Sequence, residues 1–256
     1  MKAYEYFIYR GNLDNSQIHG YGEFKWPDGR HYIGSFVNSQ MHGEGKMTWS
    51  APGNDSLRLV YKGDFYCNVI QGTGILKKSN GDSYKGFFEN AQFCGEGIYI
   101  WAGEKNKYKG EFRNGLIHGC GILHAANGIY EGELRRGLME GKGIMNFFNG
   151  DKYSGEFSNS TMTGYGCYTA VDGTKVIGYF VDGICNKHAK KIYADGRIYV
   201  GEFQNDVENG KGVLIDGHRK IKGIWRDAKL VEELVSLDVN YDKSLALTQY
   251  ASCNTS

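Results

Sequence analysis

Proline, net charge and long apolar stretches are all scarce in this chain of 256 residues. Two residues are Pro and the net charge is +1. This charge excludes a strongly basic chain that binds nucleic acid through its overall field, and the composition is not the kind that is typical of disorder. No apolar run approaches the roughly 18 residues that a membrane-spanning helix needs, so we expect no such helix.

Cysteine is present but lacks any Cys-x-x-Cys pair, which disfavours zinc and disulfide frameworks. We therefore expect reduced thiols in a cytoplasmic protein. Residues 1–11 also lack the apolar core of a secretion signal. The six cysteines are Cys67, Cys94, Cys120, Cys167, Cys185 and Cys253.

Glycine and aromatic residues are abundant, with 38 Gly, 19 Tyr and 13 Phe, and they recur in a fixed order. The cleanest copy spans residues 108–128. In it, Tyr108, Gly110 and Phe112 alternate, which places them on one face of a strand. An Asn-Gly turn follows, and then a second short strand that begins at a Gly-x-Gly pair. One copy therefore predicts a β-hairpin with a connection to the next.

Ten such units follow one another, 22 to 24 residues apart except for one interval of 29. A fixed period of this kind is the mark of a repeat architecture. Eight of the first nine units carry the Gly-x-Gly pair at the same offset, which predicts the same hairpin each time. The units begin at Tyr9, Tyr32, Tyr61, Tyr84, Tyr108, Tyr130, Tyr153, Val176, Tyr199 and Ile221.

The glycines have a predicted role in packing, because a Gly inside a strand weakens it unless the gap is used. We expect the Tyr and Phe rings to lie over the bare backbone of neighbouring strands and to form a ladder between hairpins. The opposite face is expected to be solvated and of mixed charge. It carries Lys62, Lys85, Lys109, Glu111, Glu133, Glu156 and Glu202.

The pattern is interrupted in three places. Residues 50–60 form an insertion, predicted as a protruding loop, and the eighth unit has Lys187 and Ala189 in place of the Gly pair. After Trp225 the motif stops, and apolar residues from Leu230 to Leu237 recur at helical spacing. The sequence thus predicts a hairpin array over residues 1–226, and a short C-terminal helix with a flexible tail over residues 227–256. The helix would cap the last hairpin or, alternatively, dock a partner.

The repeated unit Tyr-x-Gly-Glu-Phe-x-x-Gly-x-x-His-Gly-x-Gly, followed by Asp-Gly or Asn-Gly, resembles the MORN repeat (membrane occupation and recognition nexus). The resemblance extends from Tyr9 to Trp225. It implies an all-β fold, a single-layer, elongated and twisted sheet of about ten stacked hairpins that forms a trough. It also implies a binding or scaffold role without catalysis, and we expect the stand-alone kind, not an enzyme.

Two functions remain open at this point. The first is a scaffold or adaptor whose trough binds a peptide or helix of a protein partner, in a cytoskeletal, ciliary or axonemal assembly. The second is a membrane-peripheral module that recognises anionic lipid headgroups, which the family name favours and the net charge of +1 disfavours. Self-association is a further alternative, and no nucleic acid partner is expected.

The candidate site is the aromatic face of the central units, expected to be the concave one and to leave ring edges exposed to a partner. The alternative is that these rings only join hairpins to each other. The residues are Trp101, Tyr108, Phe112, Tyr130, Phe147, Tyr153 and Phe157.

A second candidate is the basic cluster of Lys187, Lys190 and Lys191, either a solvated edge or a contact for an acidic partner or headgroup. No catalytic residue, metal site or cofactor is expected. The Gly-x-Gly pairs lack the third Gly of a dinucleotide fingerprint. His19, His42 and His118 share one repeat position, and successive positions lie roughly 10 Å apart, too far for two of them to hold one metal ion.

Overall fold

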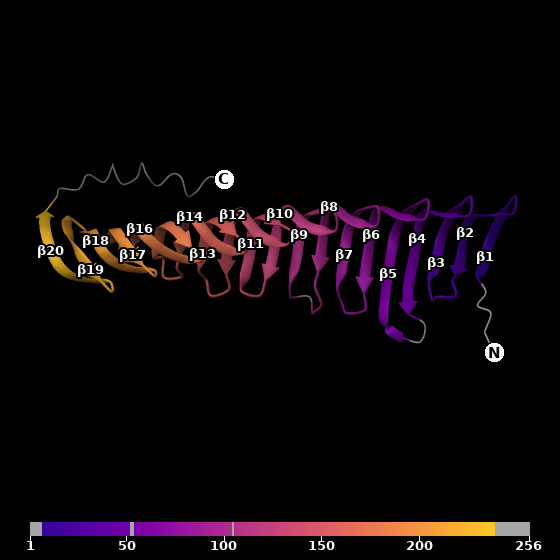
Figure 1. Ribbon diagram of the computed structural model, residues 1–256, viewed down its shortest axis with the longest axis horizontal. Coiled ribbons are helices and arrows are strands. Elements are labelled where there is room, and N and C mark those ends of the chain that lie inside the picture. The colour runs from indigo at the N-terminus through magenta and orange to yellow at the C-terminus, as the bar shows by residue number, and fades with distance from the viewer. Residues whose placement is uncertain (1–6, 52–53, 104, 239–256) are drawn as a thin grey trace. The chain divides into compact units, whose positions relative to one another are not determined.

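The computed structural model describes residues 7–51, 54–103 and 105–238, and every regular element in them is a β-strand (Figure 1). The twenty strands belong to one antiparallel sheet, so the predicted all-β class is confirmed. Among these residues no helix is long and apolar enough to cross a membrane.

The first of two compact units is Met1–Gly141. Its strands lie side by side in chain order, and each pairs antiparallel with the next (Figure 1). They are β1 (Ile8–Asp14), β2 (Gln17–Lys25), β3 (His31–Val37), β4 (Gln40–Ala51), β5 (Asn54–Tyr66), β6 (Val69–Lys78), β7 (Ser83–Glu89), β8 (Gln92–Ile100), β9 (Lys107–Arg113), β10 (Leu116–Ala125) and β11 (Gly128–Arg135).

The second unit is Lys142–Ser256, and strand β12 (Leu138–Phe147) runs across the boundary between the two. From β13 onward each strand again pairs antiparallel with the next. The strands are β13 (Lys152–Ser158), β14 (Thr161–Thr169), β15 (Lys175–Val181), β16 (Ile184–Ile192), β17 (Ile198–Gln204), β18 (Val207–Asp216), β19 (Arg219–Arg226) and β20 (Lys229–Asp238).

The hairpins combine a tight turn with a bulge wherever their register is described, as β9 and β10 illustrate. The turn residues Asn114 and Gly115 have φ angles of 51° and 77°, the left-handed pair that a two-residue hairpin turn requires. Between Ile117 and Gly121, three residues of β10 lie opposite the single residue Glu111 of β9. Extra residues of this kind bend a strand. The same count of three against one recurs in hairpins β1–β2, β3–β4, β5–β6, β15–β16 and β17–β18.

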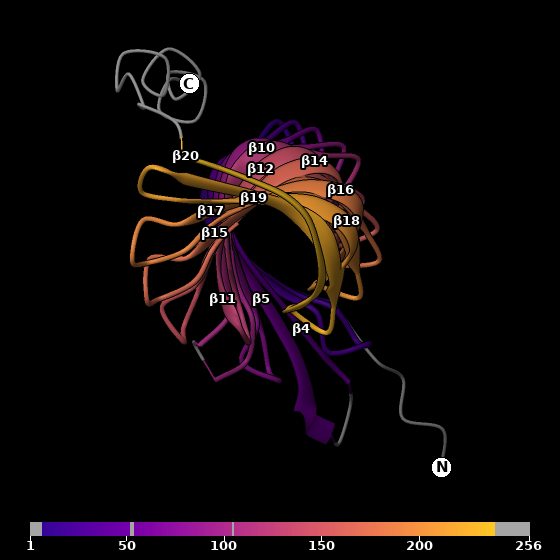
Figure 2. The ribbon, with the colours of Figure 1, turned by 90° about the vertical axis from the view of Figure 1, so that its left-hand side faces the viewer.

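The two positions of the Gly-x-Gly pair therefore need glycine for different reasons. Gly119 lies inside the bulge with a φ of 68°, where a residue with a Cβ would be strained. Gly121 is instead covered by the ring of Tyr108. The resulting bend is visible in Figure 2, most plainly in β19 and β20 of the second unit.

The predicted aromatic ladder is present in both units. The ring of Tyr61 makes an edge contact with Phe65 of its own hairpin, with centroids 5.2 Å apart, and another with Phe88 of the next hairpin, at 5.0 Å. Tyr153 and Phe180 repeat the contact between hairpins in the second unit, at 5.1 Å. These contacts bury apolar area between hairpins that could not be stable alone.

The eighth unit keeps its hairpin despite its departures from the motif. Val176 replaces the tyrosine whose ring would cover the second glycine position, and the Cβ of Ala189 occupies part of that space against Gly178. Lys187 takes the bulge position with a φ of 67°. The insertion after Ser50 is likewise absorbed, since it lengthens β4 and β5; the loop predicted over residues 50–60 is therefore largely strand, and residues 52–53 lie outside the described part.

The predicted C-terminal helix is wrong, because residues 229–238 form strand β20. Asp227 and Ala228, with φ of 50° and 62°, make the same turn as the other hairpins and return the chain along β19. The open edge of β19 offers hydrogen bonds to a strand, which outweighs a weak helical periodicity. The apolar side chains of Leu230 and Leu234 are consequently exposed. The predicted flexible tail from residue 239 onward lies outside the described residues.

Candidate functional site

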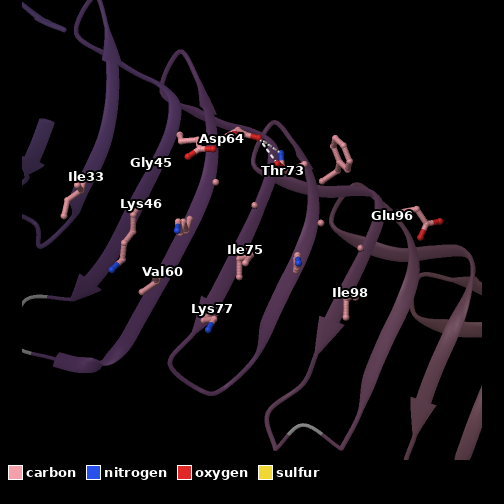
Figure 3. A pocket seen from close by; sticks show the side chains of 18 of the residues that line it. Ile33, Gly45, Lys46, Val60, Asp64, Thr73, Ile75, Lys77, Glu96 and Ile98 are labelled. Atoms are coloured by element: carbon pink, nitrogen blue, oxygen red, sulfur yellow. Dashed lines mark hydrogen bonds between the residues drawn. The ribbon is translucent and has the colours of Figure 1, made fainter. Parts of the chain in front are cut away.

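A groove in the first unit crosses strands β2 to β9 and has a volume of about 1330 Å³ (Figure 3). Its floor includes the backbone of Gly45, Gly63 and Gly74. On the other side of the sheet these glycines are covered by tyrosine rings, Tyr32 over Gly45 and Tyr61 over the other two. The groove therefore lies on the face opposite the aromatic ladder.

One row of side chains along the groove consists only of lysines and isoleucines, which alternate from Lys62 to Lys109. The row is defined by cross-strand pairing, because residues directly opposite each other on neighbouring strands lie on the same face. We call it the Lys/Ile row. It consists of Ile33, Lys46, Lys62, Ile75, Lys85, Ile98 and Lys109, on β3 to β9 in that order.

A second row, on the other side of the glycines, is acidic and aromatic. Glu44 and Asp64 are cross-strand partners, and so are Thr73 and Phe87. The carboxylate of Asp64 accepts hydrogen bonds from the backbone N–H and the hydroxyl of Thr73, at 2.8 and 2.9 Å (Figure 3). Phe87 is 52% exposed although it is a large apolar side chain.

The lysines of the Lys/Ile row have no acidic partner among the described residues. No carboxylate oxygen of that part of the chain lies within 4.0 Å of their ammonium groups, whereas Lys25 and Lys78 on the same unit do form ion pairs. Lys46 and Lys62 lie directly opposite each other, an arrangement that is unfavourable for like charges. From Lys62 to Lys109 the groove thus presents a lysine without an acidic partner among the described residues on every second strand, with an isoleucine between.

The predicted aromatic site residues are mostly buried. The exposed fraction is 5% or less for Tyr108, Phe112, Tyr130, Tyr153 and Phe157. The expectation that their ring edges stay exposed is wrong. The rings of Tyr108 and Tyr153 each lie over two glycines and make edge contacts with phenylalanine rings. Burial raises the pKa of Tyr108 to about 12.

The other two predicted aromatics are half-buried. Trp101 packs against Tyr99 with centroids 4.9 Å apart, and Phe147 packs against Tyr168 at 6.2 Å. In the first unit the predicted concave aromatic face is wrong, since the groove is on the opposite side. A role of these seven residues in partner binding stays a prediction.

The predicted basic cluster does not form one surface. On β16, Lys190 pairs with Val200 and Lys191 with Tyr199 of the next strand, so the two adjacent lysines point to opposite faces. Lys191 is 20% exposed and forms an ion pair with Glu208, with 2.7 Å between Nζ and Oε1. A contact of the three lysines with an acidic partner or headgroup stays a prediction.

Glu208 is the buried acid of the second unit, with 1% of its side chain exposed. Tyr193 donates a second hydrogen bond to the same Oε1 atom, at 2.5 Å. Burial opposes ionisation, but the contacts with Lys191 and Tyr193 outweigh it and hold the pKa of Glu208 below its ordinary value. The carboxylate thus takes a position where the corresponding strand of other hairpins has Ile117 or Met41, also opposite a phenylalanine.

Lys62, Lys85 and Lys109 lie on the face that the sequence predicts to be solvated, so the predicted sites do not include the residues of the groove. The signal was present: three successive units carry Lys directly after the starting Tyr, and Ile after the Gly-x-Gly pair of the strand between. The described residues contain no group of three or more His, Cys, Asp or Glu side chains that could hold a metal ion. The five cysteines of the described part form no disulfide, and Cys253 lies outside it.

Comparison with known families matches this chain to the MORN repeat. The model for that repeat fits eight segments that together span more than half of the chain. The eighth and tenth units, which begin at Val176 and Ile221, are not among them. The matched segments are residues 9–29, 32–51, 61–83, 84–103, 108–129, 130–152, 153–175 and 199–218.

Among curated proteins, ALS2 C-terminal-like protein from Mus musculus is 29% identical over 123 residues, and its Homo sapiens counterpart is 28% identical over 122. Each alignment covers 46% of this chain and 10% of the relative. The chain therefore matches about a tenth of the length of these relatives.

Two solved structures are similar at a low level. The TCP10 domain of Danio rerio CPAP, in complex with a peptide of Danio rerio STIL, has 13% identity and a TM-score of 0.35, covering 77% of this chain and 94% of that domain. The SAS-4 (dCPAP) TCP domain of Drosophila melanogaster, in complex with a proline-rich motif of Ana2, has 11% identity and a TM-score of 0.33, covering 79% and 93%. A likeness at this level carries no functional conclusion.

Proposed function

Because this chain belongs to the MORN-repeat family, we propose that it is a non-catalytic scaffold that binds a segment of a partner protein in the groove of its first unit. The observation that carries the proposal is the groove itself, about 1330 Å³ in volume and lined by both apolar and unpaired charged side chains. Concave sites of this size suit a chain segment, and apolar and aromatic lining supplies binding energy.

Recognition of anionic lipid headgroups is the second candidate, and the unpaired lysines are the observation that favours it. Two features weigh against it. The lysines lie in a groove, where a flat membrane surface would reach them poorly, and Glu44, Asp64 and Glu96 line the same groove and would repel an anionic surface. A protein segment can instead place different side chains toward the two rows.

The setting of this scaffold is also part of the proposal. We place it in the cytoplasm, in a cytoskeletal or ciliary assembly, as the resemblance to stand-alone MORN proteins suggests. Such an assembly needs a rigid binding element, and a ladder of interlocked rings over regular hairpins can supply one.

The test is peptide display against the full chain, followed by binding measurements on variants. Ile75→Asp puts a charge in the groove, and Ile177→Asp makes the same change on the same face of the sheet in the second unit, where the side chain is also half-buried. We expect the selected peptides to bind Ile75→Asp at least tenfold more weakly and Ile177→Asp normally. Circular dichroism and melting curves check that both variants are folded.

Hydrogen exchange gives an independent reading of the same site. A peptide in the groove should slow exchange in β4 to β9 and leave β13 to β19 unchanged. If the selected peptides bind both variants equally well and protect other strands, the groove is not the binding site and the proposal is wrong.

A further inference from the structure

The Lys/Ile row has a repeat distance that restricts what can bind along it. Neighbouring strands of a sheet lie about 4.8 Å apart, so side chains two strands apart in one row lie about 9.6 Å apart. Lys62, Lys85 and Lys109 occupy alternate strands, β5, β7 and β9. Ile75 and Ile98 occupy the strands between them. A matching ligand must therefore alternate anionic and apolar groups on one face, with a step of about 4.8 Å.

Only one regular backbone meets this condition. An α-helix rises about 1.5 Å per residue, so residues three or four apart on one face are separated by about 5 Å and residues seven apart by about 10.5 Å. In a β-strand, side chains on one face are two residues apart, or about 6.6 Å, which does not match the step of about 4.8 Å. A polyproline helix repeats every three residues, or about 9.3 Å, and has no side chain on that face at the midpoint.

We infer that the groove binds an acidic amphipathic helix that lies across the strands, with a carboxylate every seven residues and apolar residues between. The carboxylates face Lys62, Lys85 and Lys109, and the apolar residues face Ile75 and Ile98. This inference rests on the proposed function and adds the chemistry of the partner to it.

Charge explains why the row would select such a helix. The lysines have no acidic partner among the described residues, and Lys46 lies directly opposite Lys62. Carboxylates from a partner would relieve this repulsion and form charge-assisted contacts with these lysines. The equivalent row of the second unit has two lysines that lie three strands apart, so it does not offer lysines on alternate strands. It consists of Ser154, Cys167, Ile177, Lys190, Val200, Val213 and Lys222, on β13 to β19 in that order.

The experiment uses the full chain and three synthetic helices of about three heptads, stapled on the far side so that all are helical. The first carries Glu every seven residues with Leu three and four residues later. The second has the same composition with the glutamates moved to the opposite face. The third has Lys at each glutamate position of the first. Fluorescence anisotropy should show at least tenfold tighter binding of the first helix than of the other two.

Two triple variants locate the contact. Lys62→Glu, Lys85→Glu and Lys109→Glu together should weaken binding of the first helix at least tenfold and allow the third to bind. Lys152→Glu, Lys175→Glu and Lys222→Glu make the same change in net charge on exposed lysines of the second unit and should leave binding unchanged. Melting curves confirm that both variants fold.

The outcomes separate this inference from the proposed function. Equal binding of the first two helices would overturn the inference, while the proposed function would stand if peptides selected by display still depend on Ile75. Anionic vesicles of phosphatidylserine form a further arm. The inference is wrong, and the ligand is a lipid surface, if two results are found together. The vesicles bind the wild type but bind the first triple variant more weakly, and they displace the first helix from the wild type.

Discussion

The ring of Tyr108 lies over the backbone of Gly121 on the neighbouring strand, so close that a Cβ on Gly121 would overlap the ring. The hydroxyl of the same ring donates to the carbonyl oxygen of Glu111 at 3.1 Å. Edge contact with Phe112, at 5.3 Å between centroids, holds the ring from the side. The ring of Tyr108 is fully buried, so it is enclosed by these neighbours.

Gly121→Ala should therefore destabilise the protein more than Gly115→Ala does. The first change forces the buried Tyr108 ring from its place, which we expect to cost about 3 kcal/mol. The second adds a Cβ with no described heavy atom within 4 Å, and its cost of about 1 kcal/mol comes from a φ of 77°. Urea unfolding of the two variants measures the order. A larger loss for Gly115→Ala would contradict the role given to the ring.

The hydroxyl of Tyr108 can be tested apart from its ring. Tyr108→Phe removes the hydrogen bond to Glu111 while the ring still covers Gly121, so we expect a loss of about 1 kcal/mol. Tyr21→Phe is the matched control, because Tyr21 is 68% exposed and its hydroxyl bonds to no described residue. Equal melting temperatures for Tyr108→Phe and the wild type would show that the hydroxyl contributes nothing.

The hairpin array could be predicted because its determinants are local and repeated. A fixed spacing of Tyr, Gly and Phe specifies turn, register and ring contacts within about 23 residues, and most units repeat the information. The error at Leu230 to Leu237 has the opposite origin. There the motif is absent, and the strand forms because the edge of β19 is available, which is a contact between strands that periodicity alone does not reveal.

The groove was not predictable in the same way. The motif fixes which residues share a face, but it does not say which face is hollow, since that depends on the bend that the bulge introduces. The motif correctly predicts that Tyr108 and Lys109 lie on opposite faces, but the groove lies on the face of Lys109 and not on the predicted face of Tyr108. The bulge contains the left-handed Gly119, and its position follows only from the register of both strands.

The buried ion pair in the second unit allows a prediction about its components. Glu208→Ile leaves Lys191 and Tyr193 without their shared acceptor, and we expect a loss of about 3 kcal/mol. The double variant Lys191→Leu with Glu208→Ile removes the unpaired cation as well and places an apolar pair there, so it should recover most of that loss, with only the Tyr193 hydroxyl left without its acceptor. Urea unfolding at neutral pH tests the order of the three proteins.

The same pair predicts a pH dependence. The pKa of Glu208 is lowered in the folded state, so its contribution is present above its unfolded value of about 4.3 and is lost as the pH falls through the folded value. Stability should thus decline below about pH 4, and the decline should be smaller in the double variant because it lacks this group. Identical slopes in the two proteins would show that other carboxylates account for all of the acid sensitivity.

The last prediction concerns Lys46 and Lys62, which face each other across β4 and β5. Lys46→Glu replaces a like-charge pair with an opposite one and should stabilise the free protein by about 0.5 kcal/mol, while weakening the binding of an acidic helix. Lys85→Glu should weaken the same binding without any gain in stability, because its cross-strand neighbours are Ile75 and Ile98.

Measurements at two salt concentrations separate the repulsion between Lys46 and Lys62 from an effect of total charge. Near 1 M salt the screening length is about 3 Å. The gain in unfolding free energy from Lys46→Glu should then shrink, and Lys46→Glu and Lys85→Glu should have similar stabilities. Urea midpoints at low and high salt measure this. If Lys85→Glu gains as much as Lys46→Glu at low salt, the relief comes from total charge and not from the cross-strand pair. If only Lys46→Glu gains, the wild-type lysine lowers the stability of the free chain, and the reason for its presence lies in what the groove binds.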